Sequence, residues 1–225
     1  SVSNGLGRTL FLGYNGSKQL TSVSDNASPA RSVGYAYDGT GALVSSTDPL
    51  GNLTTFAYTA AAGSAPPGLL SRIFYPSNPG SPFVTNSYDS LGRVASQTNA
   101  NGASWTYFFA GYRSEEDDPL GTRHVLYYNP RGKALFDLQD AAGLNLVTKF
   151  AYDGLDRVIS TTLPEGGSTA YTYATAPNPW ANNVASIVRT PKPGSPLASL
   201  TTTYAYDPVF NKPTTVTDPR GLVTV

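Results

Sequence analysis

The chain has 225 residues, and its fifteen basic and fifteen acidic side chains give a formal net charge of zero. This balance provides no long-range field toward nucleic acid or an anionic membrane, and no apolar run approaches the roughly 18 residues of a spanning helix. Because the chain lacks cysteine, it has no disulfide, no thiolate metal site and no cysteine nucleophile.

The composition favours an all-β fold. Glycine (22 residues), proline (18) and tyrosine (15) are frequent, and these residue types favour turns and strands over helices. A chain of this length is expected to bury a sizeable core. It starts without Met, shows no signal-like segment and breaks off within a repeat, so we expect a piece of a longer protein.

Internal repetition sets the predicted domain organisation. Residues 1–29 are expected to be a degenerate N-terminal repeat or a lead-in, and residues 30–225 one continuous array of β-hairpins. In the first clear unit, Asp38 and Gly41 have the offsets of a turn that a carboxylate caps and a left-handed Gly closes. Asp48-Pro49-Leu50-Gly51 repeats this chemistry, so strands are predicted over 42–47 and 53–58.

Further units follow at irregular intervals along the chain. With the first unit included, three units share a 14-residue spacing from the Tyr of a Tyr-Asp pair to the Gly of the second turn, and the last unit has one residue more. Of two weaker copies, the one at Tyr128 replaces the Asp by Asn, and the other has Asp118-Pro119-Leu120-Gly121 after Tyr112. The predicted repeat signature consists of Tyr37, Asp38, Gly41, Asp48, Pro49, Gly51, Tyr88, Asp89, Gly92, Gly102, Tyr128, Gly132, Gly143, Tyr152, Asp153, Gly166, Tyr206, Asp207, Asp218, Pro219 and Gly221.

Alternating aromatic residues indicate how the hairpins stack. Phe56 and Tyr58, or Trp105, Tyr107 and Phe109, share one face of their strands. We therefore predict a large curved or spiral antiparallel sheet of about 10–14 strands. A β-propeller is the alternative, disfavoured because successive units do not repeat at the roughly 40–45 residues of a blade. Gly92→Val is expected to destabilise this fold, and Gln97→Ala to be near neutral.

Candidates for chemistry are few. The single His124 lies in the predicted strand 122–128 and is interpreted as a strand residue, because no motif presents a nucleophile. The acidic run Glu115–Asp118 is a candidate calcium site, but its four acids are contiguous instead of alternating, so we predict a solvated loop. Neither a metal nor a cofactor is predicted.

Proline-rich spacers are predicted to be loops between hairpins. They span 60–68, 76–82 and 190–196, where proline density excludes central strands. Exposed aromatic residues on a β surface can also stack on sugar rings, and Trp105, Trp180 and the ladder of tyrosines are the candidates for this. We expect packing within the fold to be their main role.

The repeated words resemble a known family. Tyr-Asp-x-x-Gly-Arg-Val at 88–94 and Thr-Asp-Pro-x-Gly at 47–51 resemble the YD-repeat family, which includes bacterial Rhs proteins, the B and C subunits of Tc toxins, and teneurins. The resemblance covers roughly residues 30–225. It implies a spiral of β-hairpins that closes into a hollow shell, which in the bacterial proteins encloses a C-terminal toxin.

This sequence departs from the family pattern at several turns. Asp156 stands where the Gly of the first turn is expected, Asn99 replaces the Asp of the second, and one residue is added before Lys212. The family's self-cleaving aspartyl site is similar to the word that starts at Asp218. That residue fits the ordinary repeat phase, so it is interpreted as a turn residue.

The sequence therefore predicts a non-enzymatic scaffold, a segment of a bacterial Rhs or YD-repeat shell that encloses or presents a toxin or effector polypeptide. Its partners would be neighbouring repeats of the parent chain and an enclosed toxin, without nucleic acid. The resemblance alone implies a secreted or cell-surface bacterial protein, or part of a delivered toxin complex. An extracellular adhesion or carbohydrate-binding module is the alternative, and a self-cleaving hydrolase a third that we do not expect.

Overall fold

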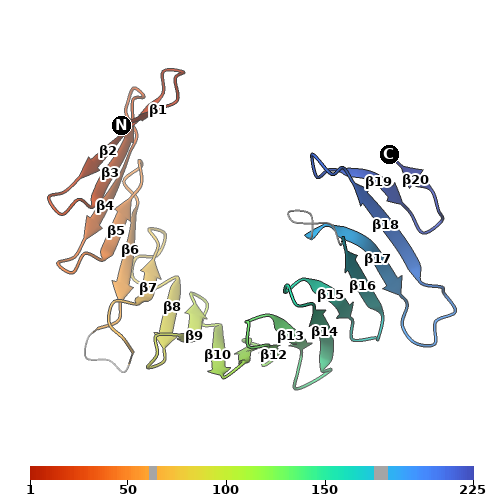
Figure 1. The fold of residues 1–225 in the computed structure, drawn as a ribbon. Coiled ribbons are helices and arrows are strands. Elements are labelled where there is room, and N and C mark those ends of the chain that lie inside the picture. Colours follow the sequence, from red (N-terminus) through yellow and green to blue (C-terminus); the bar gives the residue numbers. More distant parts are fainter. Residues whose placement is uncertain (61–64, 175–181) are drawn as a thin grey trace. The chain divides into compact units, whose positions relative to one another are not determined.

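The computed structural model describes residues 1–60, 65–174 and 182–225, and its regular elements are strands (Figure 1). No α-helix occurs in these ranges, and they hold no helix that could span a bilayer. The strands are β1 (Val2–Ser3), β2 (Thr9–Tyr14), β3 (Leu20–Asp25), β4 (Ser32–Tyr37), β5 (Leu43–Thr47), β6 (Leu53–Tyr58), β7 (Leu70–Phe74), β8 (Val84–Tyr88), β9 (Val94–Asn99), β10 (Ser104–Ala110), β11 (Arg113–Asp117), β12 (Arg123–Tyr128), β13 (Ala134–Gln139), β14 (Leu146–Tyr152), β15 (Val158–Thr162), β16 (Ser168–Tyr173), β17 (Val184–Thr190), β18 (Leu200–Tyr206), β19 (Pro213–Thr217) and β20 (Val223–Thr224).

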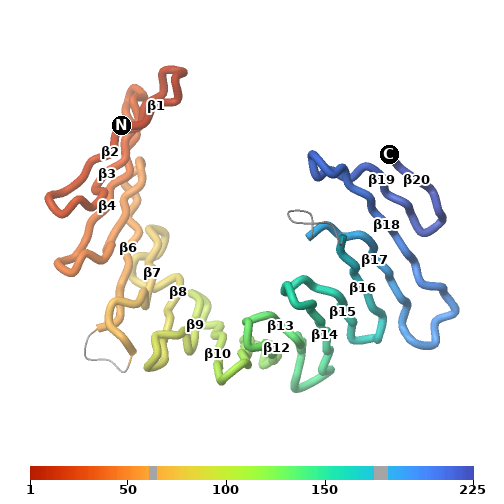
Figure 2. Tube along the Cα trace, viewed as in Figure 1, coloured from red at the N-terminus to blue at the C-terminus, as the bar shows by residue number. Residues whose placement is uncertain are grey.

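Within each of two compact units, residues 1–107 and 108–225, consecutive strands pair antiparallel, so the chain advances as tandem hairpins (Figure 2). The predicted all-β fold of tandem antiparallel hairpins is confirmed. The predicted number of strands was wrong, because the described residues contain twenty. Several of the additional strands lie next to turns that lack the Asp-to-Gly pattern used for the prediction.

The hairpins form a single layer in each unit, and the expectation of a sizeable buried core was wrong. Among the described residues, Val125 is the only buried hydrophobic residue, at 2% exposure, and Gly167 is the other buried position. Both faces of a single layer remain open to solvent, so side chains can bury area only against their neighbours in the sheet. Stability must come from strand pairing, turns and contacts between adjacent hairpins.

The two faces of the sheet differ in chemistry. Register places Tyr35 opposite Ser46 on one face, while Ala36 lies opposite Ser45 on the other. Because alternate residues share a face, tyrosine and other large apolar residues gather on the first face of these strands. The second face carries mainly Ser, Thr and Ala, and two of its hydroxyls, Ser87 and Ser96, lie 2.7 Å apart.

A β-bulge precedes the tyrosine that ends many of the strands. In β4, Ala36 pairs with Ser45 but Tyr37 pairs with Leu43, so Val44 is an extra residue on β5. The register shifts in the same way just before Tyr14, Tyr37, Tyr58, Tyr88, Tyr128, Tyr152, Tyr173 and Tyr206. A bulge increases the local twist and redirects the following side chain. The bulge thus sets the direction of each terminal tyrosine.

The acidic run lies in a strand, which corrects the predicted solvated loop. Residues 113–117 form β11, opposite β12, and only Asp118 lies in the turn that follows. Alternation places Glu115 and Asp117 on one face, where Arg113 and Arg123 pair with them. Charge neutralisation by these two arginines allows three contiguous acids, Glu115 to Asp117, to adopt an extended strand.

The proline-rich spacers connect strands. The second spacer joins β7 to β8 and the third joins β17 to β18. The first lies between β6 and β7, and its residues 61–64 are outside the described ranges, as is Trp180. At the base of the second spacer, the rings of Tyr75 and Phe83 approach with centroids 4.6 Å apart.

Candidate functional site

The first predicted turn is built around the Asp38 carboxylate. Backbone bonds close it, since Asp38 N–H donates to the Ala42 carbonyl at 2.9 Å and Gly41 N–H donates to the Asp38 carbonyl at 3.1 Å. One carboxylate oxygen, Oδ1, accepts from the backbone N–H of Thr40 at 2.8 Å and of Ala42 at 3.0 Å. Gly41 has φ +91°, the left-handed conformation that closes a three-residue hairpin loop.

The same side-chain cap recurs along the described part of the chain. In ten turns an Asp or Asn Oδ1 accepts from the backbone N–H groups two and four residues later. The capping residues are Asn4, Asn15, Asp38, Asp48, Asp89, Asn99, Asp118, Asn129, Asp153 and Asp218. A residue of positive φ stands three positions later in each, namely Gly7, Lys18, Gly41, Gly51, Gly92, Gly102, Gly121, Gly132, Asp156 and Gly221.

Several of these turns were missed or undervalued from sequence. Asn4 and Asn15 cap turns in the segment expected to be a lead-in, where Lys18 takes the left-handed position with φ +62°. Asn accepts through its amide oxygen as Asp does through a carboxylate. A search for Asn or Asp followed by any residue that tolerates positive φ would have found them. The boundary at residue 29 remains a prediction.

At two signature glycines, neighbouring atoms leave no room for a Cβ. Gly143 is outside the left-handed region, which Asp140 (φ +49°) and Asn145 (φ +50°) occupy instead. A Cβ on Gly143 would lie 2.5 Å from the Asp140 carboxylate, so Gly provides room there. Gly166 is left-handed, and a Cβ there would lie 2.8 Å from Cδ of Pro193 in a neighbouring loop.

The turn after β18 contains one more residue, as the sequence suggested. Asp207 N–H donates to the Lys212 carbonyl at 2.9 Å, and Asn211 takes the left-handed position with φ +53°. Asp207 Oδ1 accepts from the N–H of Val209 and of Phe210. Asp207 therefore still caps its turn, but on consecutive N–H groups.

The second carboxylate oxygen of several capping aspartates binds the residue that follows the left-handed position. Asp89 Oδ2 accepts from Arg93 Nε at 2.7 Å, and Asp153 Oδ2 accepts from Arg157 Nε at 2.7 Å. These hydrogen bonds favour the charged carboxylate. The backbone N–H of Arg93 contributes most to lowering the pKa of Asp89, and the Arg157 side chain most to lowering that of Asp153. The Arg that follows the left-handed position thus stabilises its turn by donating to the capping Asp.

Six of the terminal tyrosines join their strand to the preceding one. The Tyr37 hydroxyl donates to the carbonyl of Leu20, the first residue of β3, at 2.9 Å. The same bond, to the first residue of the preceding strand, joins Tyr58 to Leu43, Tyr88 to Leu70, Tyr152 to Ala134, Tyr173 to Val158 and Tyr206 to Val184. We call this contact the tyrosine tie. Partial burial raises the pKa of Tyr58, Tyr152, Tyr173 and Tyr206.

Two of these tyrosines were not in the predicted signature. Tyr58 and Tyr173 are followed by Thr59 and Ala174 instead of Asp, so the Tyr-Asp word does not mark them. Their aromatic alternation was a usable signal. Arg157 also lies over the Tyr173 ring, with its guanidinium carbon 4.3 Å from the centroid. Tyr128, by contrast, bonds the Ser114 hydroxyl at 2.9 Å.

Neighbouring turns at the same edge are also joined to each other. Gln19 Nε2 donates to the Gly41 carbonyl at 3.2 Å, which joins two successive turns of the first unit. In the second unit, Arg131 Nε lies 2.9 Å from Asp156 Oδ1 of the following turn. Each unit therefore contains side-chain contacts that join neighbouring turns at this edge.

His124 makes a bond between strands. Its Nε2 lies 2.7 Å from Asp137 Oδ1, which also accepts from Gln139 Nε2 at 2.9 Å. Across residues 1–60, 65–174 and 182–225, no three His or acidic side chains gather as metal ligands would. The contact between His124 and Asp137 therefore joins β12 to β13.

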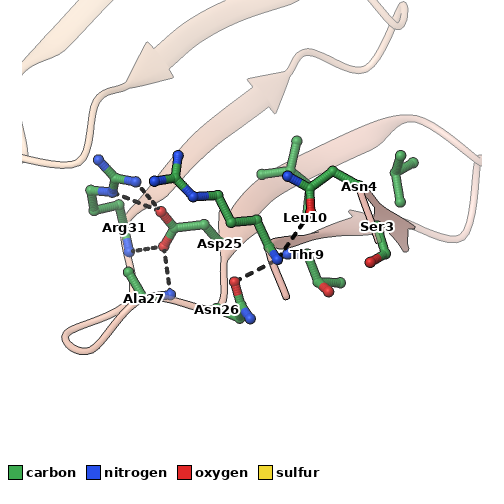
Figure 3. A pocket seen from close by; sticks show the side chains of 10 residues that line it. Ser3, Asn4, Thr9, Leu10, Asp25, Asn26, Ala27 and Arg31 are labelled. Carbon is green, nitrogen blue, oxygen red and sulfur yellow. Dashed lines mark hydrogen bonds and ion pairs between the residues drawn. The ribbon is translucent and has the colours of Figure 1, made fainter. Parts of the chain in front are cut away.

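A shallow hollow of about 560 Å³ lies beside β1, β2 and the loop after β3 (Figure 3). In its lining, Asp25 accepts from Arg31 Nε at 2.7 Å and from the N–H groups of Ala27 and Arg31. Asn26 Oδ1 accepts from Thr9 N–H at 3.1 Å. The hollow is thus lined by groups that already bond one another to shape the loop.

The chain is similar to a known repeat family and to several solved structures. The RHS repeat family model matches residues 14–52 and 37–63, which confirms the resemblance to the YD-repeat family. The crystal structure of TcdB2-TccC3 without its hypervariable C-terminal region superimposes with a TM-score of 0.67 at 16% identity, covering 89% of this chain and 12% of that one. TcdB2-TccC3-TEV covers 92% of this chain and 12% of its own, with a TM-score of 0.66 at 16% identity. No curated protein matches the sequence. The solved structures thus share the fold, and the chain spans about an eighth of their length.

Proposed function

Because this chain carries RHS repeats and has the fold of an Rhs shell segment, we propose that it is a non-enzymatic scaffold: a wall segment that encloses or presents a toxin or effector polypeptide. The observation that carries the proposal is the tandem hairpin array itself. Its polar side chains are used in capping turns and tying strands. Such an array forms a wall by adding hairpins side by side.

The faces of the sheet support this role. A wall needs two different surfaces, and in β15 the neighbours Ser160 and Thr161 belong to opposite ones. Ser160 pairs with Ala151 and Ala170, while Thr161 pairs with Phe150 and Thr169. If the sheet encloses a polypeptide, only one of these faces meets it. The partners are then neighbouring repeats along the edges of the sheet and an enclosed polypeptide on one face.

The experiment is site-specific photo-crosslinking in the producing cell. A photoreactive amino acid replaces Ser160 in one variant and Thr161 in the other. The two positions are adjacent in β15, and both side chains are half-buried. We expect one of the two variants to crosslink to a polypeptide that is not a repeat, identified by mass spectrometry. Equal crosslinking from both faces, or crosslinks to repeats alone, would contradict enclosure.

The bacterial origin and the secreted or toxin-complex location belong to the same proposal, as does the absence of catalysis. A non-enzymatic wall predicts that exchanging His124 for Gln leaves delivery of the enclosed polypeptide unchanged, since this side chain serves a bond between strands. The test is delivery compared with the parent protein. A loss of delivery by a variant that keeps its melting temperature would assign chemistry to His124.

A further inference from the structure

A polar hollow of about 520 Å³ lies between two neighbouring turns within the unit of residues 1–107. The turn from β2 to β3 forms one side of it, and the turn from β4 to β5 forms the other. The bond from Gln19 to the Gly41 carbonyl joins the two turns, and Tyr35 and Tyr37 of β4 complete the lining. This volume lies within the range of small-molecule sites.

Polar atoms of the hollow are available to a ligand. The Asp38 carboxylate caps its turn through Oδ1, and its Oδ2 accepts no hydrogen bond from the described part of the chain. In the turns at Asp89 and Asp153 an arginine side chain donates to the second oxygen, but Ala42 takes the place of that arginine here. The Tyr35 hydroxyl likewise has no partner within residues 1–60, 65–174 and 182–225. The hollow therefore presents an unused carboxylate oxygen together with an aromatic side chain.

The turn from β2 to β3 supplies hydrogen-bond donors. Asn15 Nδ2 donates to Gln19 Oε1 at 2.8 Å, and Gln19 Nε2 donates to the Gly41 carbonyl at 3.2 Å. Because an amide nitrogen carries two hydrogens, each of these side chains keeps one N–H for a ligand. No lysine or arginine is among the described residues that line the hollow, so the charge of Asp38 is not neutralised there.

The unit of residues 108–225 contains a narrower counterpart of this hollow. The sequence Tyr-Ala-Tyr-Asp that ends at Asp38 occurs again ending at Asp207, and the hollow beside this second copy measures about 240 Å³. There, Pro208 replaces the glycine that follows Asp38, and Asn183 bonds Asn211 of the neighbouring turn. The same repeat residues thus occur with and without space for a ligand, which provides a control within the chain.

We infer that the hollow between the two turns of the first unit binds an uncharged oligosaccharide. A sugar ring packs its C–H face on the Tyr35 ring, while sugar hydroxyls donate to Asp38 Oδ2 and accept from the two side-chain amides. The carboxylate repels acidic sugars, because no cation offsets its charge. The inference does not depend on the proposed enclosure of a polypeptide, since every group named lies within one unit.

Titration of the whole chain with cellotetraose, maltotetraose and chitotetraose, followed by NMR, tests the inference. We expect at least one of these sugars to cause saturable shift changes at the side-chain amides of Asn15 and Gln19 and at the backbone amide of Thr40. The backbone amide of Val209, in the counterpart turn, should not shift. Absence of saturable changes with all three sugars, or changes confined to Trp105, would overturn the inference.

Two pairs of variants assign the binding to the hollow. Tyr35→Ala should abolish the saturable changes, whereas Tyr204→Ala, the same substitution beside the narrower counterpart, should leave them unaltered. Asp38→Asn keeps the capping oxygen, as the turn at Asn129 does, and should weaken binding about tenfold through loss of a charged acceptor. This variant keeps the test informative if Tyr35→Ala fails to fold, and Asp207→Asn is its control. Equal weakening by each variant and its control would overturn the inference.

Discussion

Two turns with the same backbone geometry differ in their first residue. The turns that begin at Asp89 and at Leu163 both close through a bond from the left-handed Gly, at 3.0 and 2.9 Å, and through the N–H of their first residue. Asp89 also accepts two backbone N–H groups, whereas the Leu163 side chain has no oxygen to do so. The left-handed position and the backbone bonds are therefore enough for the shape, and the cap adds stability.

The largest expected effect breaks the feature that the two turns share. Gly92→Val places a β-branched side chain at φ +78°, with its Cβ 3.5 Å from Leu69 and Pro66 side-chain atoms. We expect a loss of about 2 kcal/mol in unfolding free energy, from denaturant titration. Gly39→Ala is the matched control in another turn, since Gly39 lacks positive φ and has open space around its Cβ. Equal losses for the two would contradict the left-handed requirement.

The next largest effect is expected for the tyrosine ties. These bonds join neighbouring strands regardless of which residue caps the adjacent turn. Tyr152→Phe removes the hydroxyl that donates to the Ala134 carbonyl at 2.8 Å and leaves the ring in place. The expected cost is about 1 kcal/mol, because a partly buried acceptor loses its donor. Tyr112→Phe should be neutral. If Tyr152→Phe were as neutral as this control, the ties would have no energetic role.

Removal of a cap should make an Asx-capped turn resemble the Leu163 turn. Asn99→Ala deletes the oxygen that accepts from Asn101 and Ala103 N–H groups, at 2.9 and 3.1 Å. We expect about 1 kcal/mol of destabilisation with an unchanged β-sheet circular dichroism spectrum. Asn99→Asp keeps the acceptor and should retain most of the stability. Loss of the β spectrum in Asn99→Ala would show that the cap determines the shape as well.

The converse change sharpens the comparison and has a smaller effect. Leu163→Asn supplies the missing oxygen to a turn whose side chain is 45% exposed, so little apolar burial is lost. We expect a gain of about 0.5 kcal/mol, measured by thermal unfolding. A decrease would indicate that Leu163 contributes more by packing than a cap contributes by hydrogen bonding.

Acid should separate Asp caps from Asn caps. Hydrogen bonds lower the pKa of Asp38, Asp48, Asp89, Asp153 and Asp218, led by side-chain donors at all but Asp89. A carboxyl whose folded pKa is depressed contributes stability that is present above its unfolded pKa, about 4, and is lost as pH falls through the folded pKa. The melting temperature should therefore fall below about pH 4. Replacing these five by Asn should flatten that fall, and an unchanged acid profile would contradict the assignment.

Much of the local structure followed from the sequence, because turn chemistry is local. Strands at 42–47 and 53–58 were predicted from the words around Asp38 and Asp48, and β5 and β6 occupy nearly the same ranges. The strand that carries His124 was predicted at 122–128 from the alternation of its residues, and β12 occupies nearly this range. In each case, the residues that decide the structure lie within four positions of one another.

What could not be predicted depends on contacts between distant residues. The single-layered sheet is one example. The length of the chain would allow a sizeable buried core, but the described residues do not form one. The acidic strand β11 is another, because its charges are neutralised by Arg123 on the next strand. Gln97, expected to tolerate Ala, donates to Asn86 Oδ1 across the β8–β9 pair at 2.9 Å, so Gln97→Ala removes a partly buried bond.

The most direct test of the hairpin array is assignment of the backbone chemical shifts of the chain by NMR. We expect chemical shifts typical of positive φ at Gly41, Gly51, Gly92, Gly132 and Gly221. Shifts typical of β-strands should flank each four-residue turn that ends at one of these glycines. Lys18 and Asp156 should show the same left-handed pattern, although neither is Gly. Chemical shifts of a continuous strand or of a helix through these four-residue turns would contradict the tandem-hairpin fold and the proposals that depend on it.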